Sequence, residues 1–290
     1  MITLKNRKLT MDIAEMGAEP LSLRTNAEGV EYLWNGDPTY WGSHAPVMFP
    51  TIGRTKDDSV EVEGKRYPMA PHGFARKSLF TVASLSSERV VFSLSDSPET
   101  RQFYPFVFTL QIIYTLIGDG YVAEARVFNQ ETDKPLYFSL GWHPAFSLAM
   151  NGEGTPMEAY RVTFSQSEHL DRMYATPVGI AGTEKDYLIG DTMPLSSELL
   201  SRDSCIFKGV VSREAVLSCL SGPHGVKIGL GDMSTLVIWS PTGKKAPFVC
   251  VEPMWTMGDR TRDLELSRME DLIRLEVGAS RAFTNTFLVF

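Results

Sequence analysis

Two histidines stand where the chain is suited to acid–base chemistry. His143 follows the apolar run Pro135 to Leu140, which is typical of a strand, and Pro144 prevents that strand from simply continuing. An imidazole fixed at the end of a rigid element is well placed for proton transfer near neutral pH. His72 lies in a turn before Gly73, where a residue without a side chain keeps the surroundings open to a ligand. Packing or capping histidines are the structural alternative for both.

Glu252 is the most informative acidic residue. It ends the apolar run Phe248 to Val251, which predicts a strand buried on both faces. Desolvation at such a strand end raises the pKa of a carboxyl group toward the range useful for a general base. An ion pair with Arg260 is the alternative interpretation. Our hypothesis is that the fold brings Glu252, His72 and His143 into one cleft.

Three further residues are candidates for contacts with a polar ligand. Arg54 follows a buried-looking segment, and its forked donors suit sugar hydroxyls or a carboxylate, although a buried ion pair is equally consistent. Asp203 is suited to accept hydrogen bonds from hydroxyls, or to cap a turn. Trp142 offers a flat face to a sugar ring, as do three other tryptophans, but most tryptophans in a protein of this size belong to the core.

The motifs missing from the sequence narrow the chemistry. There is no HxH or HExxH pair, so we expect no catalytic metal. The sequence also lacks a GxSxG elbow, a Walker loop and a dinucleotide-binding GxGxxG. These absences favour cofactor-free acid–base chemistry on a small polar ligand.

Composition and charge indicate where the protein works. The three cysteines are an odd number, lie far apart and form no CxxC, which predicts neither disulfides nor a zinc finger and favours a reducing cytosol. A net charge of -7 argues against nucleic acid or an anionic membrane as partner. The N-terminal residues 1–7 lack the apolar region of a signal peptide, and no segment is long enough to span a membrane. We therefore expect a cytoplasmic protein.

Period-two alternation predicts an all-β fold. Phe106 to Ile117 places its large apolar residues on one face, and Gly118 to Gly120 turns the chain into a second strand, Tyr121 to Phe128. No stretch of about fifteen residues has a helical period. Asp171 to Leu195 is rich in Gly, Thr and Pro and has only weak patterning. We expect a large antiparallel sandwich with few short helices, folded as one domain over residues 1–290.

Four motifs together resemble those of the aldose 1-epimerase (galactose mutarotase) family, in its LacX-like branch. The similarity covers essentially the whole chain and keeps the order and spacing of Phe49-Pro50-Thr51-Ile52-Gly53-Arg54, Pro71-His72-Gly73-Phe74-Ala75-Arg76, Gly141-Trp142-His143-Pro144-Ala145-Phe146 and Val251-Glu252-Pro253. The resemblance implies a galactose mutarotase-like β-supersandwich with an open cleft across one sheet.

The resemblance also implies roles for individual residues. Glu252 matches the base that takes the proton of the anomeric hydroxyl, and His143 matches the acid that protonates the ring oxygen. His72 matches the second histidine of the family, which polarises the substrate near the ring oxygen. Arg54 matches a hydroxyl-binding arginine, and Asp203 matches the sugar-binding aspartate.

Two departures from the family pattern lie where a sugar would be recognised. Gly53 stands where the better-known mutarotases carry asparagine, and Met254 separates Pro253 from Trp255 where LacX-like chains often continue Glu-Pro-Trp. Specificity for glucose or galactose therefore does not follow from the resemblance.

The expected function is interconversion of the α and β anomers of an aldose, without a cofactor, by a monomer or homodimer. One alternative is a hexose-phosphate 1-epimerase, which would need extra basic residues such as Arg76 or Lys77 at the far end of the sugar. The other is a non-catalytic carbohydrate sensor that has kept the cleft. The sequence leaves these alternatives open.

Overall fold

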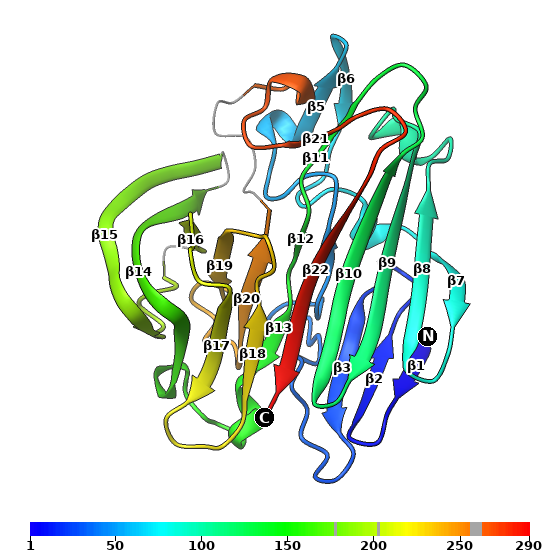
Figure 1. Ribbon diagram of the computed structural model, residues 1–290. Helices are drawn as coiled ribbons and strands as arrows, with labels where there is room; N and C mark the ends of the chain where they lie inside the picture. Colours follow the sequence, from blue (N-terminus) through cyan, green and yellow to red (C-terminus); the bar gives the residue numbers. More distant parts are fainter. Residues whose placement is uncertain (177–178, 202–203, 256–262) are drawn as a thin grey trace.

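The computed structural model describes residues 1–176, 179–201, 204–255 and 263–290, and in these ranges the chain is built from antiparallel strands (Figure 1). The all-β prediction is confirmed. The main sheet contains, in pairing order, β4 (Val47–Met48), β12 (Gly141–Trp142), β20 (Phe248–Met254), β19 (Thr235–Trp239), β16 (Cys205–Lys208), β14 (Tyr160–Thr176), β17 (Glu214–Cys219), β18 (Gly225–Gly229), β22 (Ser280–Val289), β10 (Gly120–Asn129), β9 (Phe108–Ile117), β8 (Arg89–Ser95) and β7 (Thr81–Leu85).

The remaining strands extend or cover this sheet. β13 (Ala145–Ser147) pairs with β20, and β15 (Gly179–Pro194) pairs with β14. Three smaller sheets pair β1 (Ile2–Lys5), β2 (Leu9–Ile13) and β3 (Pro20–Thr25); β5 (Ser59–Val62) and β6 (Lys65–Pro68); and β11 (Leu136–Phe138) and β21 (Ile273–Leu275).

The helices in the described ranges are short 3₁₀ segments: η1 (Lys56–Asp58), η2 (Ala75–Lys77), η3 (Thr100–Gln102), η4 (Leu148–Asn151), η5 (Met157–Ala159) and η6 (Leu266–Arg268). Among the described residues, no helix has the length and apolar character that crossing a membrane requires.

The predicted hairpin of β9 and β10 forms the centre of one half of the sheet. Phe108, Leu110 and Ile112 of β9 are buried on one face, as their alternation predicts. The three-stranded sheet packs against this half. One contact between them is the hydrogen bond that the Tyr114 hydroxyl donates, at 3.0 Å, to the carbonyl of Ala18 in the connection between β2 and β3. The large apolar residues of both sheets thereby share one core.

The weakly patterned stretch Asp171 to Leu195 is the main surprise of the fold. Its described residues as far as Pro194 belong to β14 and β15, the two longest strands in the described part of the chain, which curve away from the rest of the sheet at the left of Figure 1. Much of β15 is exposed to solvent, so its sequence carries no clear apolar alternation. Cross-strand contacts such as the ion pair of Lys185 with Asp171, at 2.5 Å, help to hold this hairpin instead.

Candidate active site

The strand register brings His143 and Glu252 together. β12 and β13 pair with β20 in one antiparallel register, in which Gly141 lies opposite Met254. His143 stands between β12 and β13 and therefore lies opposite Glu252. Residues opposite each other in adjacent strands direct their side chains to the same face. Accordingly, Nδ1 of His143 is 3.5 Å from Oε1 of Glu252.

Aromatic rings surround the His143 imidazole. Trp41 stacks on it with ring centroids 4.9 Å apart and 27° between the planes. Trp239 and His72 meet it edge-on, at 5.6 Å and 5.5 Å. His143 and Glu252 are only 6% and 2% exposed, whereas the two tryptophans and His72 are partly exposed. A ligand would therefore reach the buried pair past these rings.

The His72 loop is held by backbone contacts with the segment before Arg54. His72 adopts a left-handed φ of 67°, and its N–H donates to the Gly53 carbonyl at 2.9 Å. The Gly53 N–H donates in return to Nδ1 of His72 at 3.3 Å. Because Nδ1 accepts this hydrogen bond, the neutral ring carries its proton on Nε2.

Gly73 allows the two loops to approach closely. The N–H groups of Phe74 and Ala75 donate to the Phe49 carbonyl at 3.1 and 3.2 Å. A Cβ at Gly73 would lie 2.1 Å from that same oxygen. The segment that contains Phe49 also holds the backbone of the other histidine, because the His143 N–H donates to the Pro46 carbonyl at 3.0 Å. One irregular segment therefore positions both imidazoles.

Burial dominates the electrostatics of the two histidines. Desolvation lowers the pKa of His143 well below its usual value, and the neighbouring His72 and Arg76 lower this pKa further. Desolvation, followed by the charge of Arg76, lowers the pKa of His72 to about 4. His72 is therefore neutral at pH 7.

Two further components of the site are Cys250, which the sequence did not single out, and Arg76, which it named only as a basic residue for the sugar-phosphate alternative. The Arg76 guanidinium is partly buried, donates to the Ser43 hydroxyl at 2.9 Å, and interacts electrostatically with Glu252. Cys250 precedes Glu252 by two residues, so strand periodicity places both side chains on one face. That periodicity was a usable signal for Cys250. The position of Arg76 depends on how its loop folds back.

Of the other predicted ligand contacts, the structure describes Arg54 and Trp142. Arg54 is exposed and pairs with Asp58 at 3.0 Å, although it adjoins the His72 loop. Trp142 is buried in the core, where its indole N–H donates to Asn285 at 2.9 Å. Adjacent strand residues face opposite sides, so Trp142 points away from His143 and is not part of the site. Asp203 lies outside the described residues.

An apolar surface continues from Glu252 across the sheet. Glu252 lies opposite Val237 of β19, Val237 opposite Ile206 of β16, and Ile206 opposite Met173 of β14. Val237, Ile206 and Met173 belong to one buried cluster together with Met254. The face beside the carboxylate is therefore apolar, which strengthens electrostatic interactions there.

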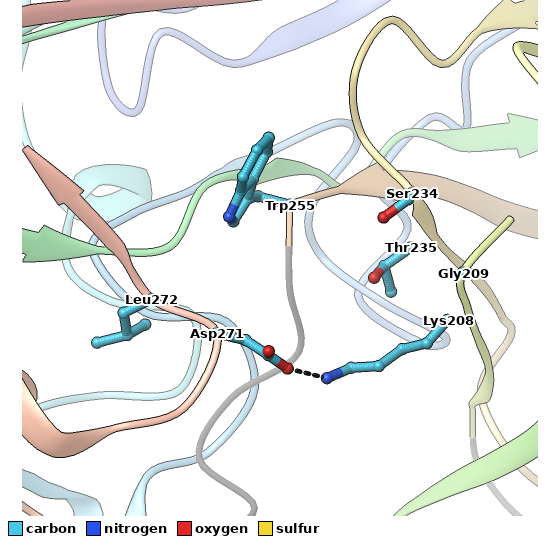
Figure 2. Close-up of a pocket in the computed structure, with 7 residues that line it drawn as sticks. All are labelled: Lys208, Gly209, Ser234, Thr235, Trp255, Asp271 and Leu272. Atoms are coloured by element: carbon cyan, nitrogen blue, oxygen red, sulfur yellow. Dashed lines mark hydrogen bonds and ion pairs between the residues drawn. The ribbon is translucent and has the colours of Figure 1, made fainter. Parts of the chain in front are cut away.

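Farther along β16 and β19 lies a cavity of about 380 Å³, shown in Figure 2. Lys208 and Asp271 form an ion pair across it. Its remaining lining residues are Gly209, Ser234, Thr235, Trp255 and Leu272. Thr235 is paired with Met254, two residues beyond Glu252, so this cavity adjoins the end of the strand that carries the carboxylate.

Comparison with known proteins identifies the family of this chain. The aldose 1-epimerase family model matches residues 1–257. The LacX proteins of Lactococcus lactis, one plasmid-encoded and one chromosomal, are each 31% identical over 261 residues, covering 87% of this chain and 86% of theirs.

Two solved structures share the fold over the full length of this chain. A galactose mutarotase-like protein from Lactobacillus casei is 32% identical with a TM-score of 0.93, and each chain is covered completely. A galactose mutarotase related enzyme from Lactobacillus acidophilus is 27% identical with a TM-score of 0.93, and 97% of its chain is covered. The galactose mutarotase-like β-supersandwich is thereby confirmed, and the chain belongs to the LacX-like branch of the aldose 1-epimerase family.

Proposed function

We propose that this protein interconverts the α and β anomers of an aldose. The observation that carries the proposal is the placement of Nδ1 of His143 3.5 Å from Oε1 of Glu252. The ring oxygen and the anomeric hydroxyl of a sugar are bonded to the same carbon. An acid and a base that act on both oxygens in one step must therefore lie side by side, as these two groups do.

In the proposed reaction, His143 and Glu252 together carry one transferable proton before and after each ring opening. Glu252 takes the proton of the anomeric hydroxyl while protonated His143 gives one to the ring oxygen, so the C1–O5 bond breaks and an aldehyde forms. Rotation about C1–C2 and the reverse transfers close the ring as the other anomer. Burial lowers the pKa of His143 and so makes its protonated form a stronger acid. The reactive form in this proposal is the one in which the single proton shared by the pair lies on His143 while Glu252, 3.5 Å away, is ionised and offsets that charge.

His72 has a supporting role in this proposal. Its neutral ring meets His143 edge-on, and its Nδ1 is occupied by the Gly53 N–H. The remaining N–H, on Nε2, is available to donate to a sugar oxygen. The partly exposed Trp41 and Trp239 offer apolar faces for the C–H side of the ring.

The decisive experiment measures anomer exchange by NMR or polarimetry across a panel of free and phosphorylated aldoses. Glu252→Gln and His143→Asn should each lower kcat by roughly 10² to 10⁴, because each removes one proton-transfer group. Sugar binding should persist in both variants. Glu153→Gln and His169→Asn, at exposed positions, serve as matched controls and should keep the wild-type rate.

The panel also separates the two alternatives. Exchange confined to phosphorylated sugars would identify a sugar-phosphate epimerase. Binding without any exchange faster than buffer would identify a carbohydrate sensor. Either result would overturn the proposal for free aldoses.

A further inference from the structure

Three potential metal ligands meet in the candidate active site. One nitrogen of His143, the thiol sulfur of Cys250 and one carboxylate oxygen of Glu252 all lie within 4.8 Å of one another. All three residues are buried, and Nδ1 of His143 has no hydrogen-bond partner among the described residues. We propose that these residues form a binding site for a borderline-soft divalent cation, with Zn²⁺ as the representative ion.

The distances suit a tetrahedral ion. With Zn–N bonds of about 2.0–2.1 Å and Zn–S bonds of about 2.3 Å, neighbouring ligand atoms lie roughly 3.3–3.7 Å apart. Nδ1 of His143 and Oε1 of Glu252 are already 3.5 Å apart. Cys250 Sγ lies within 4.8 Å of one ring nitrogen of His143 and of one carboxylate oxygen of Glu252, so side-chain adjustments of about 1 Å complete the site. Three protein ligands leave the fourth position to water or a sugar oxygen.

The donor set determines which ions fit. A thiolate and an imidazole bind Zn²⁺ and its softer relatives, whereas Mg²⁺ and Ca²⁺ prefer oxygen ligands. One thiolate, one carboxylate and a neutral imidazole balance the two charges of the ion, which favours its burial. Burial, followed by the charge of Glu252, raises the pKa of the Cys250 thiol, so the cation must displace a proton to bind.

The consequence for catalysis rests on the proposed function. A cation on Nδ1 of His143 and Oε1 of Glu252 occupies the two atoms to which the mutarotase mechanism assigns proton transfer. The site is therefore inhibitory, and Zn²⁺ and the transferable proton compete for the same groups. Binding itself requires only the three side chains and can be measured without a sugar.

The test uses Co²⁺ as a spectroscopic probe and Zn²⁺ as a competitor on the full chain after chelator treatment. We expect one Co²⁺ per chain, a near-ultraviolet thiolate-to-cobalt charge-transfer band, and loss of that band when Zn²⁺ is added. Cys250→Ser should abolish the band and weaken binding at least tenfold. Cys219→Ser removes a partly exposed thiol outside the site and should leave both unchanged.

Circular dichroism would verify that Cys250→Ser is folded, and Glu252→Gln provides a second ligand variant, also expected to bind at least tenfold more weakly. The proposed cation site would be rejected if folded Cys250→Ser bound Co²⁺ with unchanged affinity, or if the wild-type protein with Co²⁺ showed no thiolate-to-cobalt band. Inhibition is measured separately: the Zn²⁺ concentration that halves anomer exchange should rise at least tenfold in Cys250→Ser. Metal binding together with absent exchange would reject the proposed function and leave the cation site intact.

Discussion

His72 combines a left-handed backbone, a fixed tautomer and a partly buried ring, and the desolvation of this ring affects the pH dependence of stability. Its pKa is about 4 in the folded protein against 6.5 ordinarily. Between these values the unfolded chain binds a proton that the folded chain does not. The contribution of His72 to stability is therefore present above pH 6.5 and is lost as the pH falls toward 4.

Replacing this residue should reduce the sensitivity of the fold to acid. Asparagine tolerates the left-handed φ and has no titrating group, so His72→Asn keeps the loop compatible with its backbone. Between pH 7 and pH 4.5 its free energy of unfolding should fall by roughly 2–3 kcal/mol less than that of wild type. Urea unfolding at both pH values measures this difference. Parallel losses in the two proteins would show that His72 is not held neutral.

At the scale of single residues, the sequence predicted His72, His143 and Glu252 as neighbours, and the structure brings them together. Each carried a local signal, a glycine turn or the end of an apolar strand. Trp142 carried the same signal as His143, but the side of the strand that each faces depends on register. Register also pairs His143 with Glu252, and no local pattern reveals it.

At the scale of elements, the site depends on the contact between the His72 loop and the segment Phe49 to Gly53. The Phe49 carbonyl accepts two N–H groups from the loop, and Gly73 is the residue that lets this oxygen approach. This contact lies within the longer segment Ala45 to Arg54, for which the apolar composition and the prolines at 46 and 50 predict an irregular buried segment. The structure confirms this prediction apart from the short strand β4 and the exposed Arg54. The sequence could not predict which loop this segment contacts, because contacts between loops produce no periodic pattern of apolar residues.

A pair of glycine substitutions separates backbone strain from this contact. Gly73 and Gly64 have φ of 73° and 74°, but an added Cβ would meet the Phe49 oxygen at 2.1 Å in the first and nothing within 4 Å in the second. Gly64→Ala should cost about 1–2 kcal/mol of stability and leave the site unaffected. Gly73→Ala should cost more and also lower anomer exchange. Equal stability losses in thermal or urea unfolding, with equal rates, would refute this role.

The hairpin of β14 and β15 shows where element prediction fails. Strands with one buried face have alternating sequences, as β9 does, and these were predicted. Much of β15 is exposed, so burial does not impose an alternation of apolar and polar residues on its sequence. Its pairing with β14 is local in sequence and is supported by contacts between polar side chains, including that of His169 with Asp186.

At the scale of the whole molecule, the C-terminal strand β22 joins the two halves of the main sheet. It pairs with β18 on one side and with β10 on the other, as Figure 1 shows in red between them. The candidate site lies in the half that contains β20, whereas the β9–β10 hairpin lies in the other. Because the ladder of hydrogen bonds continues through β22, we propose that residues 1–290 unfold as one unit.

Phe287 offers a test of this coupling, because it lies in β22 with its ring stacked on Tyr121 of β10 at 4.9 Å and is 1% exposed. Phe287→Ala should lower the free energy of unfolding by about 3–5 kcal/mol, whereas Phe290→Ala, at a position 51% exposed, should change it by less than about 1 kcal/mol. In urea, circular dichroism reports on all strands, and tryptophan fluorescence reports on the five tryptophans, which include Trp41 and Trp239 beside His143. Both signals should shift together to lower urea in Phe287→Ala. A fluorescence transition that stays at its wild-type midpoint while the dichroism transition moves would show that the site half folds independently of β22.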